Sequence, residues 1–117
     1  TVRAALPYLK KAEFGRIVLV GSRAAIDNPP GQATFNMAKA AVMALGQSVA
    51  SELESTEVTA SVLLPSVIDT PATRATLPYA DYVNWPTPEE IAGVAEFLLT
   101  KEAGVMNGAM VPVFGKA

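Results

Sequence analysis

The sequence predicts an α/β protein with about three parallel strands and flanking helices, arranged in three layers. Helical and strand patterns alternate along the 117 residues in the order α, β, α, β, α, β, and this alternation is typical of a parallel sheet. A long helical segment separates the first two apolar runs, which is the pattern of a right-handed βαβ unit. A chain of this length forms one domain.

The first half of the chain contains the predicted βαβ unit. Apolar residues at helical spacing predict a helix over 2–12, and a continuous β-branched run predicts a strand over 17–20 that is buried on both faces. A helix over 34–54 follows, with Thr34 as a candidate N-cap, and a second strand covers 58–64. The apolar face of the long helix is expected to consist of Ala38, Val42, Leu45, Val49 and Leu53.

A long connection follows the second strand. Residues 65–86 hold Pro, Asp, Thr, Asn and aromatic residues with no strand pattern, and a connection of this length is usually functional or mobile. Thr70 and Pro71 can begin a short helix within it. Three aromatic residues either pack this loop down or line a pocket, and they are Tyr79, Tyr82 and Trp85.

The last part of the chain predicts one helix and one strand. The run from Thr87 to Glu90 combines a Thr N-cap, Pro at the first helical position and Glu three residues after the cap. A short strand over 109–113 ends the pattern, and Pro112 suits an edge or a strand end. The buried face of the helix is expected at Ile91, Val94, Ala95, Leu98 and Leu99.

Composition excludes several classes of function. The chain has no Cys and no His, so disulfides, thiol catalysis, His general-base catalysis and most zinc sites are excluded, and we expect no metal site. Its nine basic residues do not cluster and the net charge is −2, which argues against nucleic acid and anionic membranes as partners. No apolar run is long enough to span a membrane, and no leader pattern opens the chain, so we expect a cytoplasmic protein.

Ser22 and Lys39 mark the candidate site. Ser22 follows the strand at 17–20, and Lys39 lies near the start of the long helix, so both are expected at the carboxyl end of the sheet, where parallel α/β proteins bind ligands. Phe35 stands thirteen positions after Ser22 and four before Lys39. This spacing resembles the catalytic segment of the short-chain dehydrogenase/reductase family, in which the residues are Ser, Tyr and Lys.

The resemblance implies a role for each of these positions. In the family, Ser holds the substrate oxygen, Tyr passes it a proton, and Lys lowers the Tyr pKa and holds the nicotinamide ribose. Phe35 fills the Tyr position, and a phenyl ring has no exchangeable proton. The family pattern therefore implies a catalytic set of Ser22, Phe35 and Lys39 that lacks its acid.

The resemblance extends over essentially the whole chain, as the carboxyl-terminal half of a Rossmann-like domain. The run from Pro65 to Thr70 is similar to the family segment that touches the nicotinamide carboxamide, with Ser66 in place of Gly. It implies cofactor contacts from Lys39, Pro65, Ser66, Ile68 and Thr70. The run from Leu64 to Trp85 is further similar to the dihydropteridine-reductase-like branch.

The nucleotide-binding first half of the family domain is absent from the sequence. No Gly-rich turn of the kind that receives a pyrophosphate occurs in it. The family implies NAD(P) as the cofactor, but we expect this chain not to bind it tightly by itself. The first residues, which begin at Thr1, have the pattern of the later part of a helix, so we expect residues to precede them.

Simpler structural interpretations stay open for each site residue. Ser22 can be a turn residue, Lys39 a solvated side chain, Phe35 a core or interface aromatic, and Thr70 a helix N-cap. Arg23 and Arg74 can bind an anion in the crevice or face solvent, and a different chemistry built on them or on Asp69 has no positive support.

Two functions remain open at this stage. The first is an NAD(P)-dependent oxidoreductase in truncated form, without turnover of its own. The second is an interaction module that forms a homo-oligomer through helices 2–12 and 34–54 or through the unpaired edge of the strand at 17–20.

Overall fold

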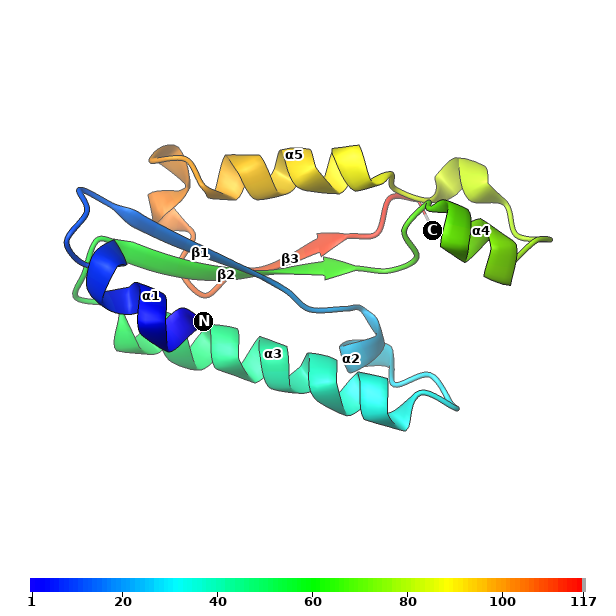
Figure 1. The fold of residues 1–117 in the computed structure, drawn as a ribbon, viewed down its shortest axis with the longest axis horizontal. Coiled ribbons are helices and arrows are strands. Elements are labelled where there is room, and N and C mark those ends of the chain that lie inside the picture. Colours follow the sequence, from blue (N-terminus) through cyan, green and yellow to red (C-terminus); the bar gives the residue numbers. More distant parts are fainter. Residues whose placement is uncertain (117) are drawn as a thin grey trace.

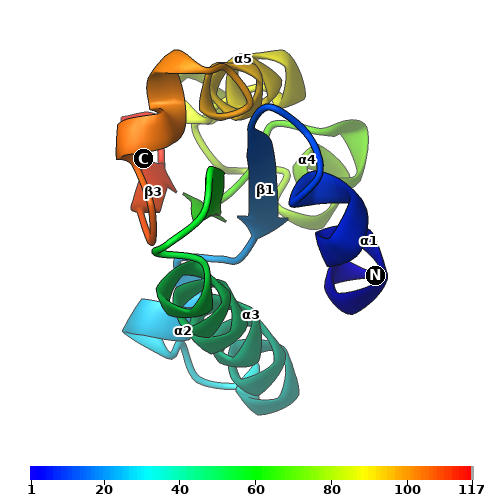
Figure 2. The same cartoon turned by 90° about the vertical axis from the view of Figure 1, so that its left-hand side faces the viewer.

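The computed structural model describes residues 1–116 and has the predicted three-layer α/β architecture. Three parallel strands lie in the order β1-β2-β3, with α1 and α3 on one face and α5 on the other (Figures 1 and 2). The α-helices are α1 (Val2–Leu9), α2 (Ala24–Asp27), α3 (Ala33–Glu52), α4 (Pro71–Thr76) and α5 (Pro88–Leu98). The strands are β1 (Gly15–Val20), β2 (Val58–Pro65) and β3 (Met110–Val113), and two 3₁₀ turns are η1 (Tyr82–Asn84) and η2 (Glu102–Val105).

The central strand β2 forms the middle of the core. All eight of its residues are buried, because β1 and β3 pair with it on its two sides and helices cover both of its faces. Val58 and Ala60 pack against Val49 and Leu53 of α3, and apolar residues of α1 and β1 extend the cluster. The predicted parallel βαβ unit is therefore confirmed.

The strand at 17–20 is longer and more exposed than predicted. It begins at Gly15, and its last residue, Val20, is 51% exposed, so the expectation of burial on both faces is wrong. The physical reason is its position at the edge of the sheet, where β2 pairs with one side and no strand of the described residues pairs with the other. Apolar composition alone does not distinguish an edge strand from a central one.

The helices end earlier than the periodicity predicts. The first helix stops at Leu9 instead of residue 12, because Lys11 and Ala12 donate to carbonyls three residues back and so tighten the last turn. The long helix ends at Glu52 and starts at Ala33 after Gln32, so Thr34 lies inside the first turn and is not the N-cap.

Parts of the predicted apolar faces are also wrong. Ala38 and Leu45 of α3 are exposed, whereas Asn36, Gly46 and Ala50 are buried with Val49. In an alanine-rich helix, apolar and polar residues alternate too weakly to define one buried face. Here that face is set by Gly46, where the helix backbone comes close to Val62 of β2. A Cβ at that position would overlap Val62 Cγ2.

The last helix and strand agree better with prediction. Thr87 and Glu90 form the predicted capping box, and Leu98 is buried, but Leu99 is 52% exposed because it follows the last helical turn. The strand Met110–Val113 lies at the second edge of the sheet. Pro112 has no N–H to donate, and proline is tolerated at an edge because one side of the strand has no neighbouring strand to bond with.

Candidate functional site

Gly21 and Ser22 carry the chain from β1 into the crevice at the carboxyl end of the sheet. A Cβ at Gly21 would lie 2.9 Å from Leu64 Cδ2, so a larger residue here would require the Leu64 side chain to shift. Ser22 is buried, and its Oγ accepts a hydrogen bond from Ala24 N at 3.1 Å. This contact begins α2, and the hydroxyl can still donate its own proton to a ligand oxygen.

Phe35 and Lys39 lie one turn apart on the same side of α3. The Phe35 ring is 45% exposed, and Lys39 Nζ is 5.9 Å from its centroid, the outer limit of a cation–π contact. Lys39 Nζ also donates to Val20 O at 3.0 Å, which ties the helix to the end of β1. The lysine therefore has a backbone acceptor and an aromatic neighbour besides the solvent.

A pocket of about 420 Å³ joins the predicted catalytic positions. Ser22, which follows β1, Phe35 of α3, and Ser66 and Val67, which follow β2, all line it. Lys39 is not part of the lining but touches Phe35 from the next turn of α3. The full lining is Ser22, Arg23, Ala24, Asp27, Pro29, Gln32, Phe35, Ser66 and Val67.

The predicted cofactor-contacting residues separate into two groups. Pro65 O accepts from Arg23 N at 2.8 Å, and Ser66 Oγ lies 3.4 Å from Phe114 O, so both stay at the crevice. Ile68 is half-buried outside the pocket lining. Thr70 Oγ1 accepts from Thr73 N at 3.1 Å and is the N-cap of α4, as the structural interpretation of this residue expected.

Helix α2 and the residue before it line part of the pocket, and of their pocket residues only Arg23 was a candidate from the sequence. Arg23 Nε donates to Asp27 Oδ2 at 2.7 Å, and the Arg23 guanidinium lies 4.9 Å from the Phe114 ring centroid. Asn36 Nδ2 donates to Pro29 O at 3.1 Å and holds the following loop against α3. The available sequence signals were Ser22, whose hydroxyl accepts from the N–H two residues on in a Ser turn, and Asn28, which ends α2 in the left-handed conformation.

The pocket can hold a polar ligand atom but offers little proton chemistry. Among the described residues that line it, the ionisable groups are Arg23 and Asp27, and these two form an ion pair. A hydroxyl such as that of Ser22 donates to a carbonyl oxygen, whereas an arginine stays protonated and cannot exchange a proton near neutral pH. The position between Ser22 and Lys39 is occupied by the phenyl ring of Phe35.

The comparisons with known proteins identify the family. Residues 1–115 match the family model described as enoyl-(acyl carrier protein) reductase. The chain is 35% identical to the 3-oxoacyl-[acyl-carrier-protein] reductase MabA of Mycobacterium bovis over 92% of its length. This chain belongs to the short-chain dehydrogenase/reductase family. It is also 33% identical to the reductase FabG of Pseudomonas aeruginosa over 97% of its length.

Solved structures of the family have the same fold. A short-chain dehydrogenase/reductase family protein superposes on 97% of this chain with a TM-score of 0.87 and 29% identity. An oxidoreductase of the same family from Burkholderia thailandensis matches 97% of it with a TM-score of 0.85 and 29% identity. The chain covers 50% and 48% of those two structures.

The short-chain dehydrogenase/reductase chain spans about half the length of the curated relatives it matches. It covers 47% of the M. bovis protein and 49% of the P. aeruginosa protein. The predicted likeness to the dihydropteridine-reductase-like branch stays a prediction. None of the helices formed by residues 1–116 combines the length and the apolar character that crossing a membrane requires.

Proposed function

We propose that this chain is the carboxyl-terminal half of an NAD(P)-dependent short-chain oxidoreductase, with a crevice that holds a carbonyl substrate but lacks the proton donor. Acting alone, it has no turnover. The named relatives that match it are reductases of 3-oxoacyl groups on acyl carrier protein, which makes a carbonyl compound the first substrate class to test. We further propose that the protein acts in the cytoplasm.

One observation carries the proposal. Phe35 lines the pocket with Ser22 and lies beside Lys39, the arrangement in which the family pattern has its Tyr acid. Ser22 can hold a carbonyl oxygen, and Lys39 supplies a positive charge one helical turn away. A general acid must have a proton to give, and a phenyl ring has none.

The residues present fit only one end of a dinucleotide. A bound nicotinamide would supply or accept a hydride, and the family pattern assigns its contacts to Lys39, Pro65 and Ser66. These residues contact Val20 O, Arg23 N and Phe114 O near the strand ends, which supports that assignment. The two turns that lead from a strand to a helix here run from Gly21 to Arg23 and from Ser66 to Thr70. Neither is a Gly-rich turn of the kind that brings backbone N–H groups to a pyrophosphate.

The test is turnover by the purified chain. NAD(P)H oxidation is followed with a 3-oxoacyl thioester. A separate assay uses a quinonoid dihydropteridine, to represent the dihydropteridine-reductase-like branch of the family. We expect no rate above the protein-free background. A rate that disappears in Ser22→Ala but persists in the surface variant Arg3→Ala would refute the proposal.

A second candidate function is an interaction module, and the edge of β1 favours it. On the side that faces β2, the backbone N–H groups of Gly15, Gly21 and Arg23 donate to carbonyl oxygens. The acceptors are Glu57 O, Leu63 O and Pro65 O. Backbone groups alternate in direction along a strand, so those of Arg16, Val18 and Val20 face away from β2. An open edge of this kind invites a strand from another chain.

Exposed apolar side chains on the neighbouring helices support the same candidate. Tyr8 of α1 is 77% exposed, and Met37 and Leu45 of α3 are 67% and 46% exposed. A homodimer through α1, α3 or the β1 edge would remove this surface from water. Sedimentation at high micromolar concentration is expected to show a dimer, and a stable monomer would count against the candidate.

A further inference from the structure

Residues 69–86 form a closed loop that begins two positions after the pocket residue Val67. Its two ends are joined, because Asp69 N donates to Pro86 O at 2.9 Å. The loop contains α4 and η1, each with its own side-chain cap, from Thr70 and Asp81. The segment predicted to be functional or mobile is thus highly organised by its own hydrogen bonds.

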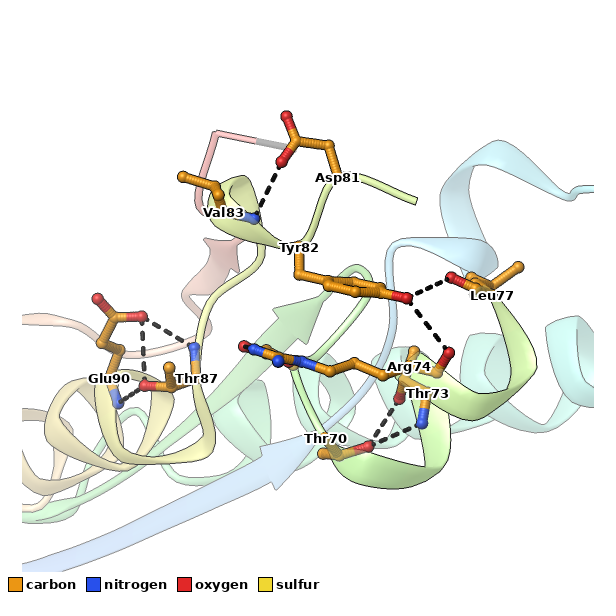
Figure 3. A network of polar contacts seen from close by, with 10 residues as sticks. Thr70, Thr73, Arg74, Leu77, Asp81, Tyr82, Val83, Thr87 and Glu90 are labelled. Carbon is orange, nitrogen blue, oxygen red and sulfur yellow. Dashed lines mark hydrogen bonds and ion pairs between the residues drawn. The ribbon is translucent and has the colours of Figure 1, made fainter. Parts of the chain in front are cut away.

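Arg74 lies at the centre of this loop. Its Nε and Nη2 donate to the two carboxylate oxygens of Asp69 at 2.5 and 2.7 Å. Its guanidinium lies 4.8 Å from the centroid of the Tyr82 ring and flat beneath it (Figure 3). The Tyr82 hydroxyl in turn donates to Leu77 O at 3.2 Å. Arg74 therefore connects Asp69, at the start of the loop, with Tyr82 of η1.

The aromatic side of the loop continues toward the carboxyl-terminal residues. The rings of Tyr82 and Trp85 meet edge to face, with centroids 5.1 Å apart, whereas Tyr79 is fully exposed and takes no part in this packing. Lys116 N donates to Asn84 O at 3.2 Å. Gly115 makes this approach possible, because its φ is +64° and a Cβ would lie 2.7 Å from Asn84 O.

We propose that Arg74 is a latch. Its contacts with Asp69 and Tyr82 hold the 69–86 loop in one ordered conformation, and the loop opens when these contacts are lost. The proposal concerns the loop itself and does not depend on whether the crevice turns over a substrate.

The burial of the two partners makes Arg74 the sensitive position. The Asp69 side chain is only 14% exposed, while that of Arg74 is 52% exposed. Removal of the arginine leaves a shielded carboxylate without its donors, and such a group regains solvation by opening the local structure. The Arg74 hydrogen bonds hold the pKa of Asp69 below its usual range, so the pair is fully charged at neutral pH.

The chain contains a built-in reporter of the latch, since Trp85 is its only tryptophan. Arg74→Ala is expected to shift the Trp85 emission to longer wavelength and to increase its quenching by acrylamide. Amide hydrogen exchange over residues 71–85 should rise about two- to fivefold, the range expected for an ion pair at the surface. Far-ultraviolet circular dichroism should stay unchanged. Arg3→Ala, which removes the same charge from an exposed site on α1, should leave Trp85 unaffected.

A milder variant covers the case in which Arg74→Ala fails to fold. Arg74→Lys keeps the charge but loses the two-point contact with Asp69, so it should give a smaller change of the same sign. The proposal is overturned if both variants leave quenching and exchange at the wild-type values. It is equally overturned if residues 71–85 of the wild-type chain already exchange as fast as an unstructured peptide.

Discussion

At the scale of single residues, Arg16 joins the amino-terminal ends of the sheet to the last helix. Its Nε donates to Thr100 O at 2.9 Å and its Nη2 to Lys101 O at 3.0 Å, so it serves the carbonyl groups that follow α5. Its Nη1 donates to Gly15 O at 2.8 Å and Glu57 O at 3.2 Å. One guanidinium thus satisfies carbonyls from three segments, at the end of the sheet opposite to the crevice.

Substitution of Arg16 should therefore destabilise the whole domain. Arg16→Lys keeps a positive charge but cannot reach all four carbonyls, and we expect it to lower the free energy of unfolding by about 2 kcal/mol. Urea unfolding followed by circular dichroism measures this change. Arg3→Ala is the control and should have no effect. An Arg16→Lys chain as stable as the wild type would show that these hydrogen bonds contribute nothing net.

At the scale of elements, two glycines inside helices have opposite roles. Gly46 of α3 lies against β2, where a methyl group would overlap Val62, whereas a methyl group at Gly93 of α5 meets no atom within 4 Å. Gly46→Ala should therefore cost about 1–3 kcal/mol through overpacking. Gly93→Ala should gain about 1 kcal/mol from helix propensity. Thermal unfolding of both variants distinguishes them, and equal shifts would contradict the packing at Gly46.

The same elements show what the sequence could predict. The start of α5 was predictable because Thr87, Pro88 and Glu90 act within one turn. The start of α3 was not, because it lacks a side-chain cap and the loop before it, held by Asn36 and Pro29, sets its first turn. Long-range contacts of this kind leave no local pattern.

The same distinction between local patterns and long-range contacts applies to the candidate site. Ser22, Phe35 and Lys39 were predictable from their spacing, and the structure places them around or beside one pocket. Arg23 was a candidate for the crevice, but the contribution of Asp27 was not predicted, since α2 has only four residues and too short a pattern to recognise. Whether the site residues bind a cofactor stays a prediction.

At the scale of the whole molecule, the proposed interaction module would use the open edge of β1 to pair with another chain. Val18 directs its N–H away from β2, whereas Leu19 directs its N–H toward it. Val18→Pro should therefore leave the domain folded and abolish pairing at this edge, and Leu19→Pro should break the sheet. Sedimentation and circular dichroism measure the two effects. A Val18→Pro chain that still forms the wild-type dimer would place the contact on α1 and α3 instead.

We propose that Ser22, Phe35 and Lys39 form a proton-transfer site without its acid, and the variant Phe35→Tyr is the test of this proposal. The phenol at position 35 is followed by ultraviolet difference titration against the wild-type chain, whose three tyrosines provide the baseline. We predict that Lys39 lowers the pKa of this phenol below the usual value of about 10. The pKa should return to that value in Phe35→Tyr/Lys39→Met. A phenol that titrates normally whether or not Lys39 is present would contradict the account.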